Sequence, residues 1–128
     1  MNTKEVIELY YKYANAGDWS KWCDLFADDM VMDEQIAGHI ENLSTLRPMM
    51  NGMGDAYAKF QNSPKVIIAE GNHAAVVSHI SALASKHPDV PIEAEVMNYF
   101  IVKDGKISYM ANFHDRVPFK PFLDVEQL

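Results

Sequence analysis

The sequence predicts an α+β fold, in which helices come first and strands follow. In the first third of the chain, large apolar residues recur at the spacing of one helix face. From about Lys59 onward they alternate or form short runs, which the turn-forming pairs Gly71-Asn72 and Asp104-Gly105 separate. We therefore expect three helices packed on a sheet of four to six strands.

The first helix is predicted at about residues 3–16. Asn2 or Thr3 can cap it, and Glu5 lies where it would complete a capping box with Asn2. Tyr10 falls on the apolar face of this helix, and a buried tyrosine needs a partner for its hydroxyl group. Tyr10 is therefore a candidate donor to a ligand, and the alternative is a tyrosine that only packs in the core.

Two shorter helices are predicted at about residues 18–27 and 45–53. Gly17 suits the left-handed position after a helix end, and Asp18 can cap the helix that follows. Pro48 is expected in the first turn of the third helix, because proline cannot lie deep inside a helix. Both helices are rich in large apolar side chains, namely Trp19, Trp22, Leu25, Phe26, Met49, Met50 and Met53.

Extended patterns predict strands before and after the third helix, with a hairpin at Gly71-Asn72. One strand of the hairpin is apolar on both faces, since Val76 and Val77 point to opposite sides. A sheet covered on both sides needs helices on one face and something else on the other, so we expect a homodimer. The predicted strands are Met30–Glu34, Val66–Ala69, Ala74–Ser85, Ile92–Val102 and Ile107–His114.

Glu34 lies on the same side of its predicted strand as Met30 and Met32, because side chains alternate along a strand. A carboxylate beside two methionines is expected to point into an apolar cavity. Desolvation penalises the charged form, so we expect the pKa of Glu34 to lie above that of a free glutamate. Such a carboxylate can act as a general base near neutral pH.

Two later strands carry polar side chains whose surroundings matter for a site. In the strand Ile92–Val102, Asn98 is the one polar residue in an otherwise apolar row, and a buried amide must find partners. The face of the last predicted strand is either a solvated surface or the lining of a pocket. Its residues are Ser108, Met110, Asn112 and His114.

Composition and charge narrow the class of protein. The chain is expected to form one domain over residues 1–128, and its formal net charge of -7 argues against a nucleic-acid partner. No apolar run is long enough to span a membrane, and Met1 leads directly into a polar segment, so a cytoplasmic location is expected. The single cysteine, Cys23, cannot form an internal disulfide, and packing beside Trp22 is favoured over a role as a nucleophile.

The motif Gly-Asp-Trp at residues 17–19, then Leu-Phe-Ala-Asp-Asp at 25–29 and a strand, resembles the entry to the nuclear-transport-factor-2-like superfamily. The likeness extends over most of the chain and ends in Asp-Gly-Lys-Ile at 104–107. The superfamily includes SnoaL-like polyketide cyclases, ketosteroid isomerase, limonene-epoxide hydrolase and scytalone dehydratase. The resemblance implies a cone-shaped, curved mixed β-sheet packed on N-terminal helices (a cystatin-like α+β roll), with a pocket between sheet and helices.

The resemblance also implies roles for single residues. Tyr10 falls where ketosteroid isomerase has its oxyanion-stabilising tyrosine, and Glu34 falls where it has its general-base aspartate. The second oxyanion acid of that enzyme would fall at Val96 or Met97, so this part is missing. In limonene-epoxide hydrolase an arginine and two aspartates act together, and here His79, Ser81 and Asn112 replace them. Epoxide hydrolysis by that route is therefore not expected.

These features predict a pocket for a small apolar or carbonyl-containing molecule. The reaction class that fits is proton abstraction beside a carbonyl, serving isomerisation, cyclisation or dehydration. A non-catalytic binding or assembly module on the same fold is the alternative. No cofactor is expected, and no metal, because no histidine or cysteine pair has the spacing of a zinc site. The catalytic candidates are Glu34, Tyr10, His79 and Asn112, and the ligand-binding candidates are Met32, Asn98, Met110, His114 and Trp22.

Overall fold

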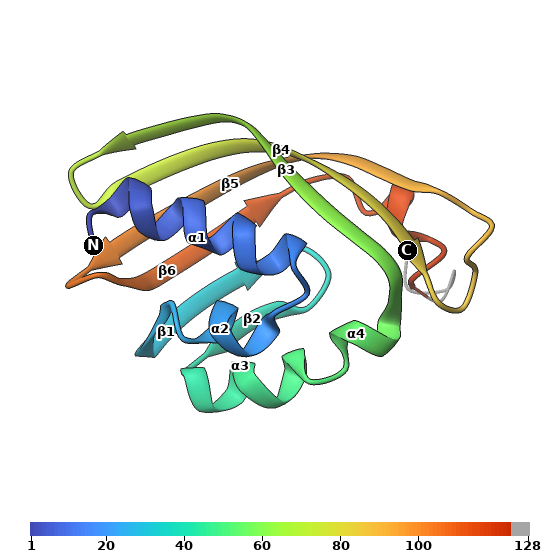
Figure 1. Ribbon diagram of the computed structural model, residues 1–128, viewed down its shortest axis with the longest axis horizontal. Coiled ribbons are helices and arrows are strands. Elements are labelled where there is room, and N and C mark those ends of the chain that lie inside the picture. The colour runs from blue at the N-terminus through green and yellow to red at the C-terminus, as the bar shows by residue number, and fades with distance from the viewer. Residues whose placement is uncertain (124–128) are drawn as a thin grey trace.

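The computed structural model describes residues 1–123 and places helices on one side of a strongly curved sheet (Figure 1). The helices are α1 (Thr3–Asn15), α2 (Trp19–Cys23), α3 (Leu43–Met50), α4 (Met53–Ala56) and a short 3-10 helix, η1 (Val117–Phe119). The strands are β1 (Phe26–Glu34), β2 (Gly38–Glu41), β3 (Tyr57–Glu70), β4 (His73–Ala84), β5 (Ile92–Lys103) and β6 (Lys106–Phe113).

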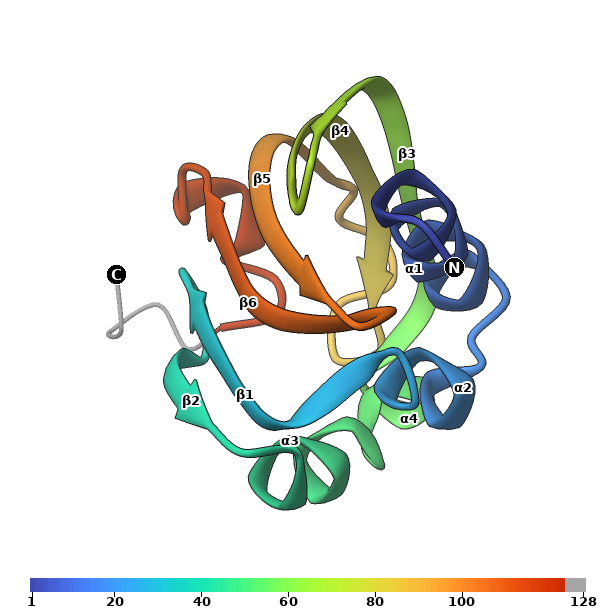
Figure 2. The ribbon, with the colours of Figure 1, turned by 90° about the vertical axis from the view of Figure 1, so that its left-hand side faces the viewer.

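The strands form a sheet in the order β2-β1-β6-β5-β4-β3. β1 runs parallel to β6, and the other neighbouring pairs are antiparallel. Figure 2 shows the sheet curling from β3 round to β2 without closing, with α1, α2 and α3 on its open side. The predicted α+β fold, a curved mixed sheet packed on N-terminal helices, is confirmed.

α1 begins as predicted and packs its apolar face against β3 and β4. The Asn2 side chain accepts the backbone N–H of Glu5 at 2.9 Å, and the Glu5 carboxylate accepts that of Asn2 at 3.2 Å. These two bonds complete the predicted capping box. Gly17 follows the helix with a φ of 70°, a conformation that favours glycine.

The second helix is shorter than the predicted span 18–27, because α2 ends at Cys23 and the chain is already extended at Phe26. The carbonyl of Leu25 accepts the N–H of Ile107 at 2.8 Å, and Phe26 pairs with Ile107 in β6. This pairing joins two segments far apart in the sequence, so a local pattern could not reveal it.

The third helix also differs from the prediction. α3 begins at Leu43, not at 45, because Leu43 and Leu46 both bury their side chains in the core. Pro48 therefore lies in the second half of the helix and not in its first turn. The helix stops at Met50, and the separate turn α4 begins at Met53.

The hairpin at Gly71-Asn72 is confirmed, but its first strand is longer than predicted. β3 begins at Tyr57 and pairs with β4 along its length, whereas the local pattern indicated a strand only from Val66. The early part of β3 has many polar residues, which concealed it. Its pairing turns Phe60 and Asn62 towards the helices.

The faces of the last two strands agree with the prediction except at Ser108 and Ile107. Asn98 lies on the inner face of β5, among buried apolar neighbours, as predicted. In β6, Ile107 pairs with Val102 and Tyr109 with Ile101, so Ser108 is an extra residue that forms a β-bulge. The bulge removes Ser108 from the predicted face. It also brings Ile107, expected on the opposite face, into the core.

Candidate functional site

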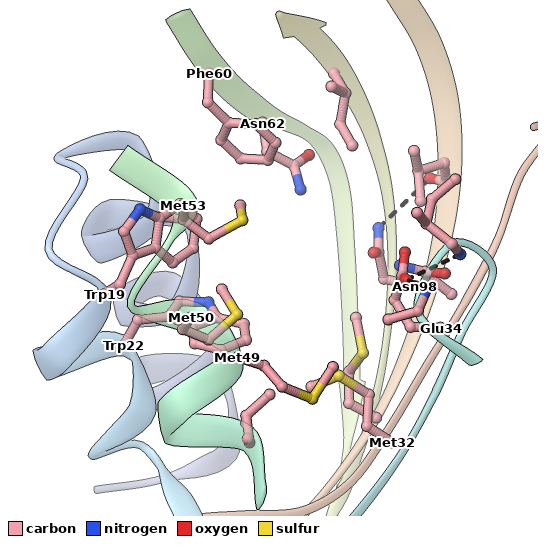
Figure 3. Close-up of a pocket in the computed structure, with 18 of the residues that line it drawn as sticks. Trp19, Trp22, Met32, Glu34, Met49, Met50, Met53, Phe60, Asn62 and Asn98 are labelled. Atoms are coloured by element: carbon pink, nitrogen blue, oxygen red, sulfur yellow. Dashed lines mark hydrogen bonds between the residues drawn. The ribbon is translucent and has the colours of Figure 1, made fainter. Parts of the chain in front are cut away.

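A cavity of about 270 Å³ lies between the concave face of the sheet and the helices. This volume is near the lower end of the range of ligand pockets, roughly 300–1,000 Å³. Figure 3 shows that the cavity has two unlike walls. Large apolar side chains from α2, α3 and α4 form one wall, and polar side chains on the sheet interrupt the other.

The apolar wall consists of aromatic rings and methionines. The rings contact one another in a continuous series of Tyr10, Trp22, Trp19, Phe60, Tyr57 and Phe122, with 4.8–5.7 Å between neighbouring ring centroids. The methionines of this wall are Met49, Met50 and Met53 on the helices, and Met32 and Met110 extend the apolar lining onto the sheet. Rings hold a fixed shape and methionines adapt theirs, so this wall suits a flat, largely apolar molecule.

A polar row crosses three adjacent strands on the opposite wall. Glu34 ends β1, Asn112 lies beside it on β6, and Asn98 pairs with Asn112 from β5. The Asn112 amide donates to the Glu34 carboxylate at 3.4 Å and accepts the backbone N–H of Gln35 at 3.0 Å. The parallel pairing of β1 with β6 therefore brings together side chains from opposite ends of the chain.

Asn98 is held in one orientation. Its Nδ2 donates to the carbonyl of Val76 at 3.1 Å and to the hydroxyl of Ser78 at 2.9 Å. A carbonyl oxygen can only accept, so Nδ2 and not Oδ1 must face it. Because both N–H bonds are used, Asn98 can offer a ligand an acceptor oxygen but no donor.

Glu34 lines the cavity as predicted, but the prediction for its pKa is wrong. Burial raises the pKa of Glu34, yet His114, Asn112 and the backbone N–H groups of Ala37 and Ile36 together hold it below the usual value. Glu34 Oε2 accepts the N–H of Ile36 at 2.9 Å and that of Ala37. Its other oxygen, Oε1, lies 3.9 Å from His114 Nε2. These charge-stabilising contacts outweigh desolvation.

His114 follows β6 directly and forms an ion pair with Glu34 at the polar end of the cavity. Its side chain is 2% exposed, whereas that of Glu34 is 21% exposed. The ring Nδ1 lies 2.8 Å from the carbonyl of Asp115 and so carries a proton that it donates there. Burial lowers the pKa of His114, but the contacts with Glu34 and the Asp115 carbonyl raise it by more than burial lowers it. The net shift is therefore upward.

Tyr10 and Tyr57 both line the cavity. Burial raises the pKa of each hydroxyl, and the negative charge of Glu34 raises both further. Each hydroxyl therefore stays protonated at neutral pH and can donate a hydrogen bond. Tyr10 comes from α1, as the sequence predicted, whereas Tyr57 was missed because the start of β3 was not recognised.

His79 lies outside the cavity, and this corrects its placement in the predicted pocket. It shares the outer face of β4 with Val77, while Ser78 and Ile80 point inward. Its ring nitrogens lie 3.0 Å from Glu93 and 3.2 Å from Glu95 on the outer face of β5. Strand alternation alone would have assigned His79 to this face.

The remaining predicted ligand-binding residues, Trp22, Met32 and Met110, all line the cavity. Sequence reasoning missed Asn62, which faces the same space from β3 and is 6% exposed. Within residues 1–123, no group of three or more histidine, cysteine, aspartate or glutamate side chains could hold a metal ion. No helix in that described range is long and apolar enough to cross a membrane.

Several solved structures share this fold across nearly the whole chain. An NTF2-like protein of unknown function from Burkholderia pseudomallei has a TM-score of 0.84 at 11% identity, with 98% of this chain and 99% of that chain covered. A protein from Catenulispora acidiphila with a ketosteroid isomerase-like fold, in complex with trimethylamine, has a TM-score of 0.77 at 11% identity, covering 87% and 85%. An LEH-like epoxide hydrolase of M. tuberculosis has a TM-score of 0.78 at 17% identity, covering 92% and 86%.

At these identities the likeness establishes the fold and not an activity. A comparison with curated protein sequences finds no match. The sequence itself matches the SnoaL-like domain over residues 7–110, from α1 to the middle of β6. That span includes Glu34 and Asn98 of the polar row and most of the apolar wall, and it ends before Asn112. The chain therefore belongs to the SnoaL-like domain family, within the nuclear-transport-factor-2-like superfamily.

Proposed function

We propose that the protein is a small acid–base enzyme that binds a largely apolar ketone and moves a proton at the carbon beside the carbonyl group. Isomerisation, cyclisation and dehydration all begin with this step. The observation that carries the proposal is the Glu34–His114 pair, a carboxylate and an imidazole 3.9 Å apart at the polar end of an otherwise apolar cavity.

His114 is the proton acceptor in this proposal. Its Nδ1 is committed to the Asp115 carbonyl, so Nε2 faces Glu34 and receives the proton. A base works best when its pKa is near the working pH, and the raised pKa of His114 meets that condition better than the lowered pKa of Glu34. Glu34 then stabilises the imidazolium that forms.

Tyr10 is proposed to stabilise the oxygen of the substrate. When the C–H bond breaks, its electron pair moves toward the carbonyl and leaves negative charge on that oxygen. The Tyr10 hydroxyl is buried in the cavity wall and stays protonated, so it can donate a hydrogen bond to this oxygen. The protonated His114 returns the proton to carbon, which completes an isomerisation without a cofactor.

The test is proton–deuterium exchange at C2 of 1-tetralone, a bicyclic ketone, followed by NMR in D2O between pH 5 and 9. We expect the rate to rise with pH through a pKa above about 6.5, because His114 must be neutral to accept a proton. In Glu34→Gln the inflection should move to lower pH, because the neighbouring negative charge is gone. A rate already constant at pH 5 would identify Glu34 as the base.

The second candidate is a non-catalytic ligand-binding module. Its supporting observation is that Glu34 Oε2 accepts the N–H groups of Ile36 and Ala37, so the carboxylate has a local structural role in the turn after β1. A protein that binds 1-tetralone but exchanges none of its protons above the buffer rate supports this candidate and contradicts the enzyme.

We also propose that the chain forms a homodimer through the outer face of the sheet. Val66, Val77, Met97 and Phe113 pair across four strands and form one apolar row there. Three of them are between 46% and 57% exposed, which is unusual for a surface that meets only water. Standard interfaces bury roughly 1,600 Å² in total. Light scattering should give twice the chain mass, and Met97→Glu should give the monomer mass.

A further inference from the structure

Asn62 is a buried residue whose side-chain oxygen has no hydrogen-bond partner among residues 1–123. It lies on the inner face of β3 opposite Ile80, is 6% exposed, and points into the cavity (Figure 3). Its Oδ1 is enclosed and accepts no hydrogen bond from residues 1–123. Leaving a buried polar group unpaired costs roughly 1–3 kcal/mol, so such groups are rare in folded proteins.

The backbone of Asn62 is fixed, so its side chain cannot simply leave the cavity. Asn15, at the end of α1, accepts the N–H of Asn62 at 2.7 Å and donates to its carbonyl at 2.9 Å. These two bonds tie the end of α1 to the backbone of Asn62 in β3. The side chain is consequently held on the inner face, at a position where an apolar side chain such as leucine would leave no polar group unpaired.

A second polar atom on the same cavity wall is also unpaired. The indole Nε1 of Trp22 is buried and finds no acceptor among residues 1–123. Trp22 lies on α2, and Asn62 lies on β3 at one edge of the sheet. Glu34 and His114 lie at the ends of β1 and β6, toward the other edge. The cavity therefore has unpaired polar groups away from the proposed reaction centre.

We infer that Asn62 is a specificity-determining residue that binds a hydroxyl group on the ligand, remote from the reacting carbonyl. A primary amide presents one acceptor and two donor N–H bonds, and a hydroxyl group can both donate to the first and accept from the second. A carbonyl or an ether oxygen can only accept, so it would leave Asn62 Oδ1 unpaired.

The ligand class is thus a flat, largely apolar ketone that carries a hydroxyl group on the side opposite its carbonyl. The carbonyl part of this description rests on the proposed function, and the hydroxyl part rests on Asn62 alone. A site that is built to hydrogen-bond a hydroxyl group discriminates strongly against the analogue that lacks it, because its own buried groups then remain unpaired.

The experiment compares the affinities of 1-tetralone and 6-hydroxy-1-tetralone, measured by calorimetry. In the natural protein the hydroxyl group should tighten binding roughly 5- to 30-fold, the effect of one well-paired hydrogen bond. In Asn62→Leu this preference should vanish. Gln61→Leu is the matched control. Gln61 is the residue before Asn62, and its side chain lies on the exposed outer face of β3, so this variant should keep the preference for the hydroxyl group.

A second measurement separates ligand binding from a structural role. If the amide is unpaired in the free protein, Asn62→Leu should raise the thermal unfolding midpoint, because it replaces a buried polar group with an apolar one of the same branching beside an open cavity. A lower midpoint, equal affinity for the two ketones in the natural protein, or failure to bind either ketone overturns the inference. A preference for the hydroxyl group without any proton exchange keeps this inference and rejects the proposed catalysis.

Discussion

Each face of the sheet carries a histidine beside glutamate, and the two clusters differ mainly in burial. On the outer face, His79 lies 3.0 Å from Glu93 and 3.2 Å from Glu95. On the inner face, His114 lies 3.9 Å from Glu34. The outer contacts are shorter, and in both clusters the pKa of the histidine is raised.

Distance alone therefore does not identify the functional pair. The side chains of the outer cluster are between 34% and 57% exposed, so water and salt screen their charges and every ring nitrogen is already engaged. The inner pair is enclosed against an apolar cavity, where a charge acts more strongly on a bound molecule. The difference teaches that the surroundings of a charged pair decide what it can do.

The largest expected effect separates the two histidines by activity. His114→Gln should slow deuterium exchange into 1-tetralone by roughly 100- to 10,000-fold, the usual contribution of a general base. His79→Gln should leave the rate unchanged, because His79 faces away from the cavity. Equal losses in both variants would show that the burial difference has no bearing on catalysis.

A stability comparison along β5 should give the next largest effect. Asn98→Ala removes a 1% exposed amide together with its bonds to the Ser78 hydroxyl and the Val76 carbonyl, so unfolding should become easier by roughly 2–3 kcal/mol. Glu95→Gln, on the outer face of the same strand, should leave the unfolding midpoint in urea in place. A similar midpoint for Asn98→Ala and the natural protein would contradict the structural role of Asn98.

The pH dependence of the protein's stability should reveal the titration of the inner pair, Glu34 and His114. The folded pKa of His114 is raised, so its stabilisation is complete below about pH 6.5 and is lost as pH rises through the folded value. The folded pKa of Glu34 is lowered, so its stabilisation is present above about pH 4.3 and is lost as pH falls through the folded value.

Thermal unfolding followed by circular dichroism should therefore give the highest midpoint between these limits, with a decline of roughly 2–6 °C toward pH 9. His114→Gln should reduce the decline on the alkaline side, and the part that remains should come from His39 and His79 outside the cavity, whose pKa values are also raised. An unchanged decline in that variant would assign the titration to another group.

The smallest effect is expected for the outer cluster. His79→Gln should shift the unfolding midpoint little at low salt, and the shift should disappear at about 1 M sodium chloride, where exposed charges are screened within a few ångströms. A large shift that persists at high salt would mean that this face is covered, as the proposed homodimer requires.

Much of the fold could be predicted from local patterns. The capping box at Asn2 and Glu5 and the turn at Gly71-Asn72 each depend on residues that are near in sequence. The end of α2 could not be predicted, because the pairing of Phe26 with Ile107 ends the helix from a distance. The same limit hid the early part of β3.

The candidate site was predictable where strand alternation holds. Alternation placed Glu34 and Asn98 on apolar faces and left the face of Asn112 open between solvent and pocket, and the structure joins all three in one row. It failed at Ser108, because a bulge shifts the alternation by one residue without any clear signal in the sequence. The pKa of Glu34 was mispredicted because its partners come from a turn and from the end of β6.

The continuous aromatic wall has a practical consequence. The chain contains two tryptophans, Trp19 and Trp22, and both line the cavity with their rings 5.5 Å apart. Indole fluorescence shifts in colour and intensity with the polarity around the ring and with hydrogen bonding at its nitrogen. All of the protein's tryptophan fluorescence, which is emitted at longer wavelengths than tyrosine fluorescence, thus originates at the pocket. The chain carries its own optical reporter of occupancy, and candidate ligands can be screened without a label.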